Sequence, residues 1–178
     1  MGSRHCIWLV AGVLCTAPAL AQGESAPILP GEIIRTAMDE ADCWLPFDEA
    51  EAYMQPARPL AGELWLLEVP CWRAAYQAGS IFLTVSADVP DAARLLRFRV
   101  PDIDGFAHEP SLTFPDYDPD GPRITSLHRA RGLGDCGSAG SWIWSQDAFI
   151  LEAYWHKDDC DGILFDPFDE PERWQVYP

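Results

Sequence analysis

The segment "SWIWSQDAFILEAYW" (residues 141–155) decides the fold, because it has the pattern of two β-strands joined by a tight turn. Aromatic and aliphatic residues crowd both sides of a short polar stretch, residues 145–147. Runs of this composition are typical of strands, and a few polar residues between two such runs are typical of a hairpin connection. The segment therefore predicts a β-hairpin from Trp142 to Trp155.

Other runs rich in aromatic and β-branched residues are separated by Pro, Asp and Gly, which favour turns. The predicted strands are residues 62–71, 80–87, 94–100 and 123–129, with short strands near 111–114 and at the terminal "RWQVY". In residues 94–100, Leu96, Phe98 and Val100 alternate with Leu95, Arg97 and Arg99, so one face of that strand is apolar and the other carries cationic groups.

One amphipathic helix is predicted N-terminal to the strands, at about residues 32–41. Its apolar residues recur at helical spacing, Pro30 precedes it, and acidic residues occupy the other face. "FDEAEAYM" (residues 47–54) favours a second, shorter helical turn. The sequence thus predicts an α+β fold leaning to all-β, an antiparallel sheet with one short N-terminal helix, in a single globular domain over residues 22–178.

The first 21 residues have the anatomy of a secretory signal peptide. Arg4 and His5 precede an apolar run too short to span a bilayer, and Ala19-Leu20-Ala21 forms a cleavage site. Leu14 stands where a lipoprotein signal needs a small residue before Cys15, which argues against a lipid anchor. The pattern predicts export to the periplasm, or secretion, with no membrane insertion after cleavage.

The chain is strongly acidic. Its 178 residues include 28 Asp and Glu against 12 Lys and Arg, a formal net charge of −16. Nucleic acids and anionic membranes present phosphate, so electrostatic binding to either is disfavoured. A cationic partner is compatible with this charge. High net charge also keeps a secreted protein soluble. Because like-charged copies repel one another, we expect a monomer.

The predicted mature chain keeps four cysteines, which in an exported protein indicates two disulfides with three possible connectivities. No C-x-x-C pair supports a zinc site or thioredoxin-like exchange. Cys136 and Cys160 fall near the open end of the predicted hairpin, which makes Cys136–Cys160 the favoured bridge. Cys43–Cys71 then ties the helical region to the first strand.

Gly132, Gly134 and Gly137 spell the G-x-G-x-x-G fingerprint of a dinucleotide-binding turn. Such a turn lies between a buried parallel strand and a helix, whose N-terminus meets the pyrophosphate. The residues that follow, "SAGSWIWS", have a strand pattern instead. The glycines therefore indicate a tight, irregular turn beside a disulfide, and no cofactor is expected.

The block "RGLGDCG…W-x-W" (residues 131–144), with "VPCWRAAY" upstream and Cys160 downstream, resembles an exported Gram-negative bacterial family. That family is domain of unknown function number eleven seventy-six. The resemblance covers about residues 60–162 and corresponds to the C-terminal half of the family's usual, longer members. It implies export, disulfides and a β-rich scaffold. It implies no activity and no catalytic residue.

"DYDPDG" (Asp116, Asp118, Asp120) imitates the opening of a calcium-binding loop, in which carboxylates alternate before a glycine. The twelfth position, where an EF-hand needs a bidentate Glu, is Leu127. The flanking prolines favour a rigid turn in which Asp accepts local amides. We therefore predict no metal site and retain these aspartates as a calcium alternative.

Four further residues are candidates for binding. Trp142 and Trp144 share one face of a strand, where they either form a stacking platform for sugar rings or cationic groups, or fill the core. Core packing is the favoured role. Asp135 and Arg131 either provide a functional carboxylate or form a turn-stabilising pair, and the second role is favoured.

Catalytic motifs are missing from the sequence: it contains no G-x-S-x-G and no H-E-x-x-H, and no two histidines have metal-ligand spacing. No catalytic residue is predicted, and the chain is expected to be a non-enzymatic binding domain of the cell envelope, contacting a protein or a glycan. Two alternatives remain. One is an acidic inhibitor of a cationic enzyme such as lysozyme, and the other is an envelope-glycan hydrolase that uses a carboxylate pair.

Overall fold

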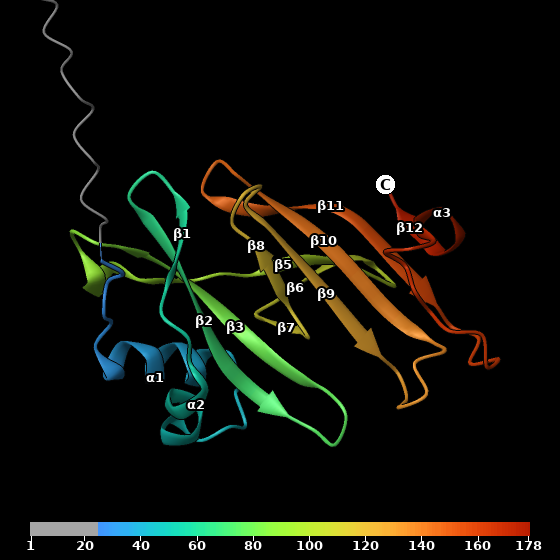
Figure 1. Cartoon of the computed structure of the whole chain (residues 1–178), viewed down its shortest axis with the longest axis horizontal. Helices are drawn as coiled ribbons and strands as arrows, with labels where there is room; N and C mark the ends of the chain where they lie inside the picture. The colour runs from blue at the N-terminus through green and yellow to red at the C-terminus, as the bar shows by residue number, and fades with distance from the viewer. Residues whose placement is uncertain (1–24) are drawn as a thin grey trace, which may run out of the picture.

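The computed structural model describes residues 25–178, and the predicted signal peptide lies outside them. Two five-stranded antiparallel sheets and a two-stranded hairpin make up most of the fold. In Figure 1 the two N-terminal helices lie beside the first sheet, and the second sheet lies on its opposite side. The predicted β-dominated α+β class, stapled by two disulfides, is confirmed.

The first sheet has the order β1-β2-β3-β4, and β7 also pairs with β3. Its strands are β1 (Arg58–Ala61), β2 (Leu64–Arg73), β3 (Ala78–Ser86), β4 (Arg94–Leu95) and β7 (Ser111–Thr113).

The second sheet has the order β12-β11-β10-β9-β8. Its strands are β8 (Asp116–Asp118), β9 (Arg123–Arg129), β10 (Gly137–Ser145), β11 (Ala148–Lys157) and β12 (Gln175–Tyr177). A separate hairpin is formed by β5 (Phe98–Asp102) and β6 (Gly105–Glu109). The helical segments are α1 (Gly31–Glu40), α2 (Phe47–Tyr53), the 3₁₀ turn η1 (Pro90–Ala92) and α3 (Pro171–Trp174).

The predicted hairpin is confirmed as β10 and β11. Ser145 pairs with Ala148, so the connection is two residues, Gln146 and Asp147. Their φ angles are +49° and +69°. Positive φ at both central residues belongs to a type I′ turn, whose twist matches that of the flanking strands. β10 begins at Gly137, five residues before the predicted start of the hairpin, and extends the pairing to the disulfide.

The single strand predicted over residues 94–100 is wrong, because the chain changes partners within it. β4 pairs with β3 of the first sheet, whereas β5 pairs with β6. The Leu96 amide still donates to the Phe82 carbonyl at 2.8 Å, and pairing with β3 ends there. Leu96 and Phe98 are both buried in the core between the sheets, which draws the chain from one sheet towards the other.

The first sheet is buried on both faces, which explains why β3 is apolar along most of its length. Ile34, Ala37 and Met38 of α1 pack with Val69 of β2 on one face. On the other face, the two sheets share a core that contains Leu66, Phe82, Phe98, Leu112, Ile124, Trp142 and Phe149. Edge-to-face contacts link its aromatic rings, including Phe98 and Trp142 with centroids 5.5 Å apart.

Both predicted disulfide pairings are confirmed. Cys43–Cys71 joins the segment after α1 to β2, and Cys136–Cys160 joins the start of β10 to the segment after β11. The second bridge closes a loop with a sequence separation of 24 residues.

Replacing either end of the second bridge is expected to have the same effect. Cys136→Ser, Cys160→Ser and the double variant should each lower the free energy of unfolding by about 3 kcal/mol, because each reopens the same loop. Urea denaturation measures the three values. A second loss in the double variant, or clearly unequal single losses, would contradict this expectation. The control combines Cys136→Ser with Cys43→Ser, which opens the other bridge. The losses in the free energy of unfolding from these two changes should add.

Candidate functional site

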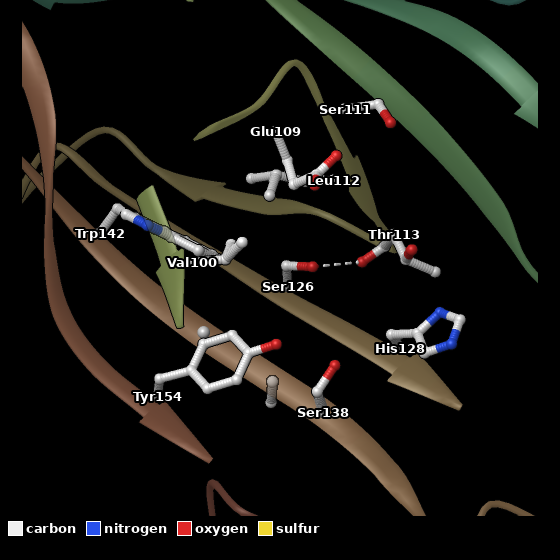
Figure 2. Close-up of a pocket in the computed structure, with 12 residues that line it drawn as sticks. Val100, Glu109, Ser111, Leu112, Thr113, Ser126, His128, Ser138, Trp142 and Tyr154 are labelled. Atoms are coloured by element: carbon white, nitrogen blue, oxygen red, sulfur yellow. Dashed lines mark hydrogen bonds between the residues drawn. The ribbon is translucent and has the colours of Figure 1, made fainter. Parts of the chain in front are cut away.

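A pocket with a volume of about 430 Å³ opens between the second sheet, β7 and the β5–β6 hairpin. Figure 2 shows its lining side chains, which come from six strands. Most of the polar ones are uncharged: Ser111, Thr113, Ser126, His128, Ser138 and Tyr154. The pocket is therefore a polar cavity built at the junction of three β-structures.

The register of the second sheet places one wall of the pocket. Gly140 of β10 lies opposite Ser126 of β9 and Tyr154 of β11, and Ser138 lies opposite His128. Directly paired residues share a face of a sheet, so these side chains point the same way. The alternation of β9 and β10 thus delivers hydroxyls and an imidazole to a single surface.

Trp142 forms the floor beside this wall. Gly140 has no side chain, and the Trp142 ring covers its backbone: a Cβ built on Gly140 would lie 2.2 Å from Cη2. The indole Nε1 donates to the carbonyl of Arg99 in β5 at 2.8 Å. The ring therefore fastens the β5–β6 hairpin over the second sheet, while its edge lines the pocket.

The opposite wall is held in place by contacts between strands. The Ser126 hydroxyl donates to the Thr113 carbonyl at 2.8 Å, which ties β9 to β7 (Figure 2). At the outer side of the hairpin, the Arg99 guanidinium lies 3.4 Å from the Phe106 ring centroid. Phe106 in turn meets Tyr177 of β12 edge-on. The pocket is framed by elements that are fixed to one another.

The electrostatics of the pocket favour an uncharged ligand with hydroxyl groups. Desolvation by the surrounding strands lowers the pKa of the His128 imidazole from its ordinary value. At neutral pH the ring is therefore uncharged and offers one donor and one acceptor. Glu109 is the one lining residue that carries a carboxylate. Hydroxyls, an imidazole and an indole edge suit a polar ring such as a sugar.

Trp142 and Trp144, predicted either as a stacking platform or as core residues, differ in how deeply they are buried. Trp142 is 1% exposed and belongs to the core between the sheets. Trp144 is half-buried and packs edge-on against Phe149, with ring centroids 5.2 Å apart. The pair therefore presents no open double platform, although the edge of Trp142 reaches the pocket.

Asp135 and Arg131 lie at the Cys136–Cys160 disulfide and do not line the pocket. Asp135 is fully buried. Arg131 Nε donates to its Oδ1 at 2.7 Å and a second guanidinium nitrogen contacts Oδ2, while the Gly162 amide also donates to Oδ2 at 2.7 Å. The Arg131 guanidinium holds the pKa of the Asp135 carboxyl well below its usual range, and the Gly162 amide adds to this effect.

Sequence reasoning missed Lys157, the cationic centre of the same network. Its ammonium is buried and donates to the carbonyls of Asp135 and Ile163 and to the Asp161 carboxylate. The hydrogen bond from Lys157 to Asp161 lowers the pKa of the Asp161 carboxyl. The signal was available in the strand pattern, because Lys157 occupies the buried face of β11 two residues after Trp155.

The aspartates of the calcium alternative lie on and beside β8. Asp116 and Asp118 are exposed on either side of the buried Tyr117, and the Asp118 carboxylate accepts the Asp120 amide at 3.0 Å. This is the local turn bond that the flanking prolines favour. Across residues 25–178, no group of three or more His, Cys, Asp or Glu side chains is arranged to hold a metal ion.

The glycine segment connects β9 to β10, which are antiparallel neighbours, and the prediction that a strand follows it is confirmed. Gly134 and Gly137 have φ angles of +71° and +148°, which L side chains rarely adopt. The three glycines shape a turn that leads into the disulfide, as predicted.

Comparisons with known proteins agree with this description. Residues 13–177 match the model of a family described as "Protein of unknown function (DUF1176)", so the match extends well beyond the residues that carry the resemblance in the sequence. The chain is similar to "Uncharacterized protein YpfG" of Escherichia coli (strain K12), at 28% identity over 110 residues. These residues are 61% of this chain and 30% of that relative, so the matched region spans less than a third of the relative's length.

No solved structure matches the chain. Within residues 25–178, no helix is long and apolar enough to cross a membrane. The family match covers nearly the whole chain, including both disulfides and the glycine turn between β9 and β10. The chain therefore belongs to the DUF1176 family.

Proposed function

We propose that this protein is an exported, non-enzymatic binding domain of the cell envelope that takes an uncharged, hydroxyl-rich ligand, such as a sugar unit of an envelope glycan, in the pocket between β7, the β5–β6 hairpin and β9–β11. The observation that carries the proposal is the lining itself. Serine, threonine and tyrosine hydroxyls line it together with a neutral imidazole and the edge of a buried indole. Few convergent polar groups around an aromatic surface are typical of a ligand pocket.

Export to the periplasm is supported by two independent features. The N-terminal sequence has the three-part pattern of a signal peptide. The two disulfides need an oxidising compartment to form and persist. Both fit a protein that works outside the cytoplasm, where envelope glycans are found.

The pocket gives less support to a glycan hydrolase with a carboxylate pair. Such an enzyme needs two carboxyl groups flanking the scissile bond, about 5 to 9.5 Å apart. The lining of this pocket contains Glu109 and no second Asp or Glu. Binding without cleavage is therefore the function that its chemistry favours.

Titration with N,N′-diacetylchitobiose by isothermal calorimetry tests the proposal. We expect a measurable heat of binding and a Kd in the micromolar to millimolar range. Ser138→Phe should weaken binding at least tenfold, because the added ring fills the pocket. His128→Ala should weaken it roughly five- to tenfold through the loss of one hydrogen bond to the ligand. Ser145→Phe is the matched control, since Ser145 ends the same strand at the exposed turn.

Three outcomes would contradict the proposal. The first is no binding of chitobiose or of soluble peptidoglycan fragments at millimolar concentration. The second is binding that Ser138→Phe leaves unchanged, which would place the ligand elsewhere. The third is the release of shorter glycans, which would favour the hydrolase.

A further inference from the structure

A second feature of the molecule lies at the end that carries the Cys136–Cys160 disulfide, on residues that do not line the pocket. Three loops meet there: the β2–β3 connection, the β9–β10 connection and the segment that follows β11. Four apolar or aromatic side chains that they contribute are exposed by 43–65%: Tyr76, Leu133, Ile163 and Leu164. We call these four residues the disulfide-end patch.

The patch is continuous across the tip of the β9–β10 connection. The Tyr76 ring lies 3.7 Å from the position that a Cβ would take on Gly132. On the other side of Leu133, a methyl carbon of Leu164 lies 3.7 Å from the corresponding position on Gly134. Along the loop Leu133 therefore lies between the positions next to Tyr76 and Leu164, and both of its sequence neighbours are glycines.

The loop beneath the patch is heavily braced. The Gly134 amide donates to the Arg131 carbonyl at 3.0 Å, and the Phe165 amide donates to the Gly134 carbonyl at 3.0 Å. Asp135 is buried under Arg131, and Cys136 is fully buried in its disulfide. Each of these residues has a role inside the protein, whereas Leu133 is 65% exposed. Because the backbone of this loop is fixed, presenting an apolar side chain from it costs little backbone entropy on binding.

The segment that carries Ile163 and Leu164 is acidic, while the two arginines of the glycine loop, Arg129 and Arg131, lie on the same side, with Arg131 paired to Asp135. Residues 158–172, which carry Ile163 and Leu164, contain seven Asp and Glu and no Lys or Arg. The one lysine next to this segment, Lys157, is buried in the network below it. An apolar centre next to an acidic segment is complementary to a protein surface with an apolar recess and basic residues beside it.

We infer that the disulfide-end patch is a docking surface for a basic protein, with Leu133 as its apolar anchor. Charge excludes the other occupants. Two copies of this chain, each with a net charge of −16, repel one another, and anionic lipid or nucleic acid is repelled for the same reason. The inference rests on residues outside the pocket lining and does not depend on the proposed ligand.

Binding to hen lysozyme, ribonuclease A and cytochrome c, three small basic proteins, tests the inference by biolayer interferometry at 150 mM NaCl. We expect at least one to bind, and Leu133→Ser to weaken its binding at least tenfold. The effect should lie mainly in the dissociation rate, because an apolar anchor does not steer encounter. Raising the salt concentration should slow association with the wild type and with Leu133→Ser alike.

Ile103→Ser is the matched control, because Ile103 is 95% exposed between two aspartates at the tip of the β5–β6 hairpin. It should bind like the wild type, and thermal melting should show both variants folded. Equal losses in the two variants would mean unspecific attraction to an acidic protein and would overturn the inference. The absence of binding to all three proteins, preferential binding to lipid vesicles, or self-association in gel filtration would overturn it as well. Chitobiose titration of Leu133→Ser should match the wild type, which separates this result from that for the pocket.

Discussion

Replacing Asp135 by alanine is expected to lower the Tm by roughly 5 to 10 °C, because it removes a buried carboxylate that pairs with the half-exposed Arg131 and accepts the Gly162 amide. The carboxylate accepts hydrogen bonds from the Arg131 guanidinium and the Gly162 amide and is fully buried. Without it, the Gly162 amide and the guanidinium lose their acceptor beside the disulfide. Differential scanning calorimetry of the oxidised protein gives the shift. Asp159→Ala, in the exposed segment after β11, is the control and should change the Tm by no more than about 2 °C.

The same carboxylate gives the protein a defined dependence on pH. The pKa of Asp135 is held below its usual range, so the charged form is favoured in the folded state. Its stabilising contribution is therefore complete above the unfolded pKa of about 4 and is lost as the pH falls towards the folded pKa. The stability difference between the wild type and Asp135→Ala should be constant from pH 8 to 5 and should shrink below about pH 4. A difference that grows in acid would contradict the role given to Asp135.

Local pattern was sufficient for most elements of the fold. The polar residues 145–147 between two apolar runs predicted the β10–β11 hairpin, and the hairpin in turn placed Cys136 close to Cys160. Each of these steps depends on neighbours in sequence, where alternation and turn chemistry act directly. The Cys136–Cys160 bridge follows because a hairpin brings its two open ends together, and Cys43–Cys71 follows as the remaining pair.

Elements that depend on contacts between distant segments were not predictable. The division of residues 94–100 between β4 and β5 is caused by two sheets that compete for Leu96 and Phe98. The pocket was not foreseen either, because Thr113 of β7 and His128 of β9 meet only where the two sheets join. An isolated serine or threonine on a strand does not indicate, from its neighbours in sequence, that it lines a cavity together with residues of other strands.

The relation between Gly140 and Trp142 shows how the fold and the pocket depend on each other. A Cβ on Gly140 would lie 2.2 Å from Cη2 of the indole and 2.7 Å from Cζ2 and Cζ3. The ring is buried between the sheets and anchored to the Arg99 carbonyl, so it has little room to move. The Trp142 ring can therefore occupy this position only because residue 140 is a glycine. A related contact occurs across two strands of the first sheet, where the Trp72 ring of β2 covers its partner Gly79 in β3.

A double-mutant cycle tests this dependence. Trp142→Ala should lower the free energy of unfolding by about 3 to 5 kcal/mol through lost packing and a cavity. Gly140→Ala should cost about 1 to 3 kcal/mol in the wild type, because the methyl group forces the ring out of place. In the Trp142→Ala background the methyl group meets no ring, and alanine is favoured over glycine within a strand by roughly 0.5 kcal/mol. The effect of Gly140→Ala should therefore reverse its sign, as measured by urea denaturation of the four proteins. Additive losses would show that the glycine is needed for the strand itself and that the indole does not depend on it.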